Sequence, residues 1–195
     1  DGGGIWMSES SHTFTNTAII GNTAHRGGGI YLQDTPDSDQ CELCSDFYCN
    51  PYLNNMTISG NSAEIAGGGI YLENANPIIT NSIIWNNSPG SIALDTGNEE
   101  PIISFTNIEG GWEGEGNINT APLFTNLENN DHTLSLGSPC IDSGNPNVWY
   151  QDMDGTIADM GATGGLYLLP NKININFGEV GDLSISKQFS LLNIR

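Results

Sequence analysis

A repeat in the first half of the chain constrains the fold more than any other feature. Gly-Gly-Gly-Ile begins at residues 2, 27 and 67, and the last two copies continue as Gly-Gly-Gly-Ile-Tyr-Leu. A second motif, seven residues long with Asn at both ends, begins at Asn16, Asn55 and Asn81. Repeats with periods of about 20–50 residues are typical of chains that stack one small unit upon the next. The sequence therefore predicts a solenoid.

The seven-residue motif aligns without gaps and produces two columns of asparagine. The columns are, in chain order, Asn16, Asn55 and Asn81, and then Asn22, Asn61 and Asn87. Successive copies start 39 and 26 residues apart, and a weaker fourth copy at Pro101 follows 24 residues after Pro77. An insertion at residues 33–50 accounts for the longer interval, so the basic period is about 22–26 residues.

Apolar residues within each copy alternate with a period of two, which indicates strands rather than helices. Thr17 and Ile19, for example, alternate with Ala18 and Ile20. Short strands that end at Gly or Asn cannot bury a face alone, whereas stacking them buries a continuous core. We therefore predict an all-β fold, with a parallel β-helix over residues 1–169 and a short β segment over residues 170–195.

Asparagine suits both columns for physical reasons. It tolerates the left-handed αL conformation at turns, and stacked amides can form hydrogen bonds from coil to coil. We expect both columns to form a structural asparagine ladder beside an inward stack of Ile19, Ile58 and Ile84. The triple glycines are expected to mark a bend that needs a positive φ or a close backbone approach.

Negative charge is concentrated in the predicted solenoid. The chain has 23 acidic and four basic residues, a net charge of −19. Residues 1–170 contain 21 acidic residues and one base, Arg26, a net of −20, and residues 171–195 have a net of +1. This imbalance disfavours nucleic acid and anionic membrane surfaces as partners. No apolar run reaches the ~18 residues needed to span a bilayer, so we expect no membrane insertion.

A succession of further motifs follows the repeat. These are Pro77–Asn87, Ser104–Trp112, Gly114–Asn119, Ala121–Phe124, His132–Leu134, Gly137–Asp142, Asp152–Gly155 and Asp159–Gly161. Together they resemble bacterial right-handed parallel β-helix repeat proteins of the pectin-lyase-like superfamily, over about residues 1–166. The resemblance implies a right-handed helix in a large secreted surface protein. Residues 1–5 match the middle of a coil, so we expect earlier coils and an N-terminal cap to be missing.

The C-terminal segment alternates strongly over residues 173–180 and 184–193. It resembles the first two strands of an Ig-like β-sandwich that follows such solenoids. A complete sandwich needs about seven strands, so the domain is predicted to be incomplete. Its unpaired edges would be prone to add strands from a partner.

Two classes of function are open to this architecture. Lyases of the resembled superfamily use Arg or Lys, often with Ca²⁺, but Arg26 is the only base in residues 1–170, and the negative charge would repel a polyanion. Carboxylate pairs such as Glu64 with Glu73, or Glu113 with Glu115, could serve in hydrolysis. The alternative is that these carboxylates are part of an exposed acidic surface and have no catalytic role, because charged side chains are mostly exposed.

We therefore expect an extracellular structural or adhesive scaffold module of a multidomain surface or filament protein. Its expected partners are a polysaccharide or neighbouring copies of itself. The alternative is a carbohydrate-active enzyme, either a polysaccharide lyase or a glycoside hydrolase, on the same β-helix.

Three cysteines, Cys41, Cys44 and Cys49, lie in the insertion. A disulfide in an oxidising compartment is the favoured interpretation, while a metal knuckle and free thiols stay open. Cys140 follows Pro139 in an apolar stretch and is expected to be a small buried residue.

The strongest candidate for an ion site is Asp152, Asp154 and Asp159, which surround the turn-making Gly155. Closely spaced carboxylates supply the oxygen ligands that Ca²⁺ prefers, and Asp142 and Asp131 would add to them if folding brought them near. A purely structural closing turn is the alternative. Calcium is the only cofactor that the sequence suggests.

Three tryptophans, Trp85, Trp112 and Trp149, are candidates for contact with a glycan. Indole rings can pack against the apolar faces of sugars, but a single ring more often packs beneath a loop. Both interpretations stay open for each of the three.

Overall fold

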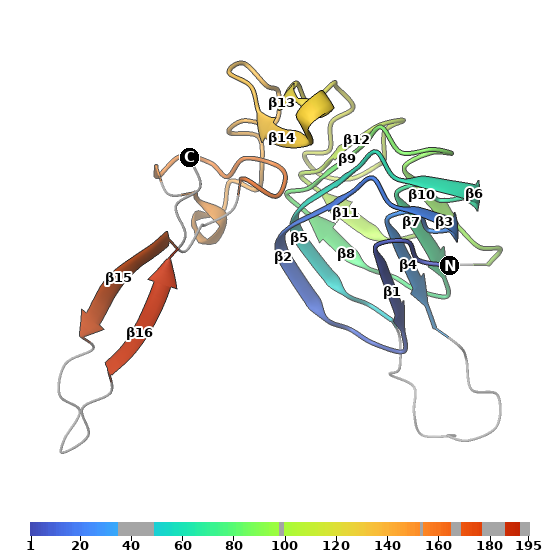
Figure 1. Ribbon diagram of the computed structural model, residues 1–195, viewed down its shortest axis with the longest axis horizontal. Coiled ribbons are helices and arrows are strands. Elements are labelled where there is room, and N and C mark those ends of the chain that lie inside the picture. Colours follow the sequence, from blue (N-terminus) through green and yellow to red (C-terminus); the bar gives the residue numbers. More distant parts are fainter. Residues whose placement is uncertain (35–48, 98–99, 153, 165–168, 177–185, 192–195) are drawn as a thin grey trace. The chain divides into compact units, whose positions relative to one another are not determined.

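The computed structural model describes residues 1–34, 49–97, 100–152, 154–164, 169–176 and 186–191. The chain divides into two compact units, Asp1–Gly165 and Leu166–Arg195. The first unit is all-β with mostly parallel sheets, as predicted, and its strands curl into a half-barrel (Figure 1). Its helical content in the described residues is two single 3₁₀ turns, η1 (Leu127–Asn129) and η2 (Val148–Tyr150).

One parallel sheet collects the strands that follow the glycine repeats. The isoleucine that ends each Gly-Gly-Gly-Ile motif occupies the same register position in three neighbouring strands, and Ile92 continues the row in the fourth. The strands, in their order across the sheet, are β1 (Ile5–Ser8), β4 (Ile30–Gln33), β7 (Ile70–Glu73) and β10 (Ile92–Leu94).

A second parallel sheet collects the strands of the asparagine motif. Ile19, Ile58 and Ile84 share one register position, and Ile19 is nearly buried while the other two are fully buried, which gives the expected inward stack. The strands are β2 (Thr13–Ile20), β5 (Tyr52–Ser59), β8 (Ile78–Thr80), β9 (Ile83–Trp85), β11 (Ile102–Ser104) and β12 (Asn107–Ile108).

Three two-stranded sheets complete the described structure. β3 (Thr23–Arg26) and β6 (Ser62–Ala66) pair in parallel. In the sequence, each of them follows a strand of the second sheet and precedes a strand of the first. The antiparallel pairs are β13 (Phe124–Asn126) with β14 (Asp131–Leu134), and, in the second unit, β15 (Leu169–Asn176) with β16 (Ser186–Leu191).

The glycine repeats serve both purposes that the sequence suggested. Gly27 and Gly67 open two of the repeats with φ values of 61° and 65°. Gly28 needs space instead, because a Cβ there would lie 2.6 Å from the carbonyl carbon of Ser62. The backbones of neighbouring repeats are hydrogen bonded directly, with Gly28 N–H donating to Gly67 O at 3.0 Å. Only glycine permits this spacing.

The two ends of the strand stack differ. At one end, Phe105 N–H donates to Glu115 O at 2.7 Å, Ile108 N–H donates to Ile118 O at 2.9 Å, and Trp112 packs against the core. At the other end β1, β2 and β3 each pair on one side only within the described residues. β10 and β11, toward the first end, likewise pair with one strand only, so strand edges open to extension are present at both ends.

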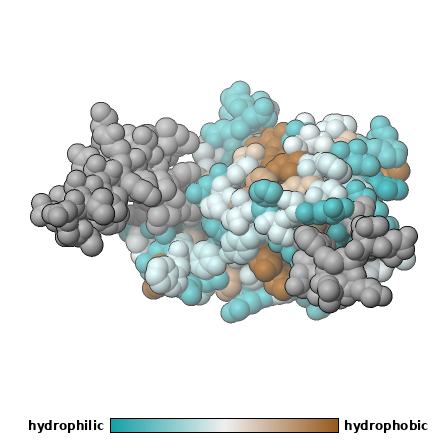
Figure 2. Space-filling view, turned by 90° about the horizontal axis from the view of Figure 1, so that it is seen from below, coloured by the Kyte–Doolittle hydropathy of each residue, from teal (hydrophilic) through white to brown (hydrophobic). Residues whose placement is uncertain are grey.

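Exposed apolar side chains are dispersed over the first unit. In the view of Figure 2 they form separate brown patches within a mainly polar surface. The most exposed large ones with defined positions are Trp6, Ile102, Leu136, Val148 and Trp149.

Candidate functional site

The second asparagine column forms a hydrogen-bonded ladder through the turn that precedes each glycine repeat. Asn22 donates from its backbone N–H and from Nδ2 to Asn61 Oδ1, at 2.9 and 3.1 Å. Asn61 repeats both bonds to Asn87 Oδ1, each at 3.0 Å. The carboxamide oxygens of Asn61 and Asn87 therefore each satisfy two donors of the preceding repeat, and both residues are buried.

The first asparagine column has a different role. Asn16, Asn55 and Asn81 adopt φ values of 51°, 50° and 50°, in the αL region expected for asparagine at a bend. The amides of Asn55 and Asn81 do not bond to each other. Asn55 Nδ2 donates to Asp159 O at 3.1 Å, and Asn81 Oδ1 accepts from Asn145 N–H at 2.7 Å. This part of the column binds the chain segment of residues 138–162 to the sheet.

That segment brings three carboxylates together. Asp142, Asp152 and Asp159 place one carboxylate oxygen each within 4.8 Å of one another. Asp159 Oδ1 also accepts from Asp142 N–H at 2.8 Å. Asp142 joins the cluster because the segment folds back on itself, with Gly144 N–H donating to Ala158 O and Met160 N–H donating to Cys140 O.

Asp154, which the sequence placed in the ion site, lies outside this cluster. Its Oδ1 accepts from Thr156 N–H at 2.9 Å and from Thr156 Oγ1 at 2.7 Å, which is a local turn. Asp131 is also engaged elsewhere, since its Oδ1 accepts from Thr133 in β14.

Burial and mutual repulsion shift the ionisation of the cluster. Burial, followed by the hydrogen bond and charge of Asp154 and the charge of Asp159, raises the pKa of Asp152 to about 6. The hydrogen bonds from Asp152 and Thr156 lower the pKa of Asp154 to about 2. Burial is the main cause that raises the pKa of Asp159. A cation between these oxygens would relieve the repulsion.

The tryptophans differ in accessibility. Trp149, in η2, is 86% exposed, so its ring is free for a ligand. Trp85 and Trp112 are half-buried and pack against two separate core clusters, which matches the packing interpretation for these two rings.

An aromatic row on the first sheet was missed by the sequence reasoning. Trp6, Tyr31 and Tyr71 share one register position on β1, β4 and β7. The two tyrosine rings are stacked with centroids 5.3 Å apart, and the Arg26 guanidinium lies 5.5 Å from the Tyr71 centroid. Trp6 is 56% exposed. The residue after each Gly-Gly-Gly-Ile is aromatic, and this alignment could have revealed the row.

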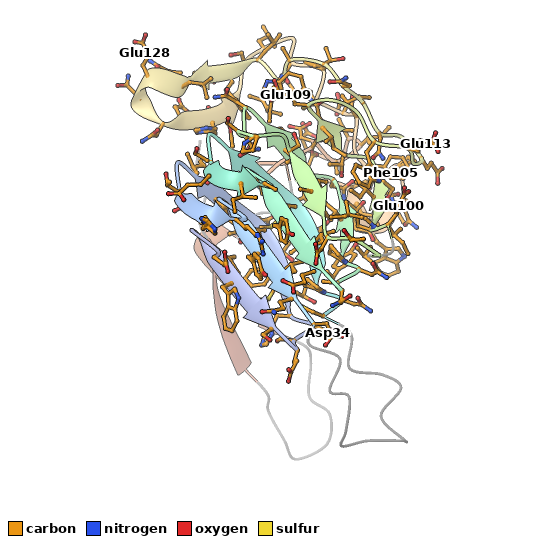
Figure 3. All side chains as sticks on the ribbon, turned by 90° about the vertical axis from the view of Figure 1, so that its right-hand side faces the viewer. Asp34, Glu100, Phe105, Glu109, Glu113 and Glu128 are labelled. Carbon is orange, nitrogen blue, oxygen red and sulfur yellow. The ribbon has the colours of Figure 1, made fainter. Side chains whose placement is uncertain are left out.

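Two of the four remaining candidate carboxylates, Glu64 and Glu73, have local partners. A carboxylate oxygen of Glu64 lies 2.9 Å from His25 Nδ1. Glu73 accepts a hydrogen bond from the Tyr31 hydroxyl. Glu113 and Glu115 lie exposed in a loop. Figure 3 shows Glu113 at the surface, well apart from Glu128.

The structure describes only one of the three cysteines that were candidates for a disulfide, Cys49. Cys41 and Cys44 lie outside the described residues. Cys49 is a buried free thiol that approaches Ser10 O at 3.1 Å. Cys140 is likewise buried and accepts from Asn107 Nδ2 at 3.1 Å, as expected for a small core residue.

Comparisons with protein-family models, curated proteins and solved structures found no match to this chain. In the part of the chain that the structure describes, no helix has the length and apolar character to cross a membrane.

Proposed function

We propose that the first unit is a right-handed parallel β-helix that acts as a rigid scaffold module of an extracellular, multidomain surface or filament protein. The observation that carries this proposal is the continuous register of neighbouring strands together with the buried Asn22–Asn61–Asn87 ladder. Each coil is fixed to the next by main-chain bonds, by apolar contacts and by carboxamides. Such a stack resists bending and can be extended at its β1–β3 edge.

The exposed rings support glycan engagement by this scaffold. Trp149 and Trp6 present apolar faces to solvent, and the polar, acidic surface around them keeps the module soluble. The high negative charge favours neutral glycans over polyanionic ones.

The alternative function, a carbohydrate-active enzyme, draws on one specific observation. Asp152 and Asp154 are neighbouring carboxylates whose pKa values are driven apart, to about 6 and about 2. Glycoside hydrolysis uses a protonated acid and an ionised carboxylate about 5–9.5 Å apart, so the directly hydrogen-bonded Asp152 and Asp154 would have to separate around a substrate.

One assay separates the two functions. The protein is incubated with a panel of neutral and acidic polysaccharides, and both retention in affinity gels and the release of reducing ends are measured. The scaffold predicts retention by at least one neutral polysaccharide, weakened by Trp149→Ala, with no release of reducing ends. Depolymerisation that is lost in Asp152→Asn and kept in Asp95→Asn would instead establish the enzyme.

The acidic cluster is where we propose that Ca²⁺ binds. Ca²⁺ holds oxygen ligands at about 2.3–2.6 Å, so ligands on opposite sides of the ion lie about 5 Å apart. One carboxylate oxygen each of Asp142, Asp152 and Asp159 lies within 4.8 Å of the other two, which fits this geometry. Bound Ca²⁺ would fasten residues 142–159 against the sheet through Asn55 and Asn81.

Calcium and pH should therefore affect stability together. In chelator the folded state retains a proton on Asp152, with its pKa of about 6, at pH values where the unfolded chain, with a pKa of 3.8, has lost it. This contribution to stability is present at about pH 4 and is lost as the pH rises through about 6. We expect Ca²⁺ to raise the melting temperature at pH 7.

Thermal melts at several pH values, with chelator or with Ca²⁺, test this expectation. Asp152→Asn should flatten the pH slope in chelator and reduce the response to Ca²⁺. The matched variant Asp95→Asn changes an exposed carboxylate outside the cluster and should retain both effects. Coincident melts with chelator and with Ca²⁺ at pH 7 would show that the cluster is only a structural turn.

A further inference from the structure

The asparagine ladder ends at a donor that has no acceptor among the described residues. In the first two steps of the ladder, the backbone N–H of Asn22 and of Asn61 donates to the next carboxamide oxygen. The equivalent N–H of Asn87 lacks such a partner in the described structure, although Asn87 is only 7% exposed. Asn87 lines a groove at the surface, so the acceptor that the described chain does not supply can come from solvent or from a ligand.

The sequence explains why the ladder stops there. Strand β12 pairs with β9 so that Asn107 faces Ile83 and Ile108 faces Ile84. Continuing this register places Gly111 opposite Asn87. Glycine supplies no carboxamide, and the chain also turns away, because Gly111 N–H donates to Ile108 O at 2.9 Å and Gly110 and Gly111 both have positive φ.

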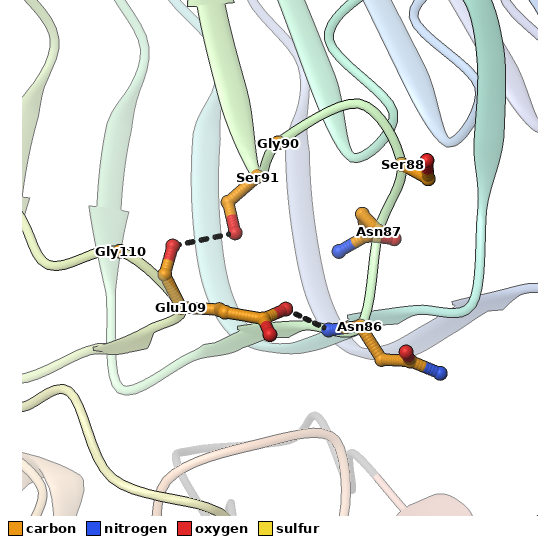
Figure 4. A pocket seen from close by; sticks show the side chains of 7 residues that line it. All are labelled: Asn86, Asn87, Ser88, Gly90, Ser91, Glu109 and Gly110. Carbon is orange, nitrogen blue, oxygen red and sulfur yellow. Dashed lines mark hydrogen bonds between the residues drawn. The ribbon is translucent and has the colours of Figure 1, made fainter.

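A groove occupies the place of the missing ladder step (Figure 4). Its volume is about 360 Å³, near the lower end of the range of about 300–1,000 Å³ for ligand sites. One wall is the turn from Asn86 to Ser91, and the other is formed by Glu109 and Gly110. Its lining is polar, and its only charged side chain is Glu109.

Glu109 is held in position on the opposite wall. Its Oε2 accepts from Asn86 N–H at 2.6 Å, and its carbonyl oxygen accepts from Ser91 Oγ at 2.9 Å (Figure 4). A carboxylate has about four acceptor sites on its two oxygens, so Glu109 retains capacity for a ligand donor. The groove thus presents one fixed acceptor, the Glu109 carboxylate, and one main-chain donor, Asn87 N–H, that has no acceptor among the described residues.

We propose that this groove binds the acetamido group of an N-acetylated sugar. The acetamido carbonyl would accept from Asn87 N–H, in the place that a carboxamide oxygen takes in the ladder. The acetamido N–H would donate to the Glu109 carboxylate, and the sugar hydroxyls would meet the rim at Ser88 and Asn86. The choice of a glycan rests on the proposed function, and the negative charge of Glu109 disfavours an acidic sugar.

The test is a titration of the ¹⁵N-labelled protein, followed by amide chemical shifts. N-acetylglucosamine should shift the Asn87 and Glu109 amide signals in a saturable manner, and glucose should not. Glu109→Gln keeps the size of the side chain and an acceptor for Asn86, but it removes the charged acceptor for the ligand. We expect it to weaken binding by about tenfold or more, since hydrogen bonds to charged groups are the stronger ones.

The matched control is Glu128→Gln, which makes the same charge change on η1, away from Glu109 in Figure 3, and should bind as the unaltered protein does. Absence of a shift at Asn87 would mean that the groove holds solvent only. Equal binding by Glu109→Gln, or stronger binding of N-acetylasparagine amide than of the sugar, would also overturn the proposal. Polysaccharide retention through Trp149 is a separate readout, so the scaffold function can stand or fall independently.

Discussion

Replacing Gly68 by Ala is expected to lower the free energy of unfolding by at least about 3 kcal/mol, the upper end of the usual range for overpacking. A Cβ at this position would lie 2.5 Å from the carbonyl carbon of Ser88 and still closer to Ser88 N and O. These are backbone atoms of the next repeat, so no side-chain rotation can relieve the collision. The two repeats would have to separate, and the main-chain hydrogen bonds between them would be lost. Urea unfolding followed by circular dichroism measures the change.

Gly90→Ala is the matched control for this substitution. Gly90 has a φ of 72°, and a Cβ there meets no atom within 4 Å. Its replacement therefore costs only the strain of placing alanine in the left-handed region, about 1–2 kcal/mol. If Gly68→Ala were no more destabilising than Gly90→Ala, the close stacking of the glycine repeats would be contradicted.

The features that the sequence predicted well are those in which equivalent residues of successive repeats pair with one another. The all-β class, the parallel pairing of the Gly-Gly-Gly-Ile strands and the Ile19–Ile58–Ile84 stack depend on residues at equivalent positions, and an ungapped alignment already shows them. The αL conformation of the first asparagine column followed from the turn chemistry of asparagine alone.

The features that the sequence could not supply depend on contacts outside the repeat. Asp142 joins the acidic cluster because residues 138–162 fold back over Asn55 and Asn81, and no spacing along the chain encodes that return. Asp154 was placed in the ion site on spacing, but a turn with Thr156 uses its carboxylate. The groove beside Asn87 lies where Gly111 supplies no side chain to continue the ladder, and no sequence motif predicts this groove.

Asn61→Ala is the second substitution with a large expected effect, a loss of about 3 kcal/mol, because it breaks the ladder at its centre. Asn61 Oδ1 accepts both the N–H and the Nδ2 of Asn22. Its own Nδ2 donates to Ile19 O at 2.9 Å and to Asn87 Oδ1. Alanine removes all four bonds and leaves two main-chain groups of the neighbouring repeat, Asn22 N–H and Ile19 C=O, without these partners.

The gradient along the ladder makes this prediction specific to its geometry. Asn22 is half-buried at the open end, and Asn22→Ala removes only two donations, from its Nδ2 to Asn61 Oδ1 and to Ile20 O. Its backbone N–H still bonds to Asn61, so we expect a loss of about 1 kcal/mol. Urea unfolding of both variants measures the difference. Equal losses would mean that the two asparagines act only through their local turns, whereas a larger loss at Asn61 identifies the carboxamide stack as the connection that holds neighbouring repeats in register.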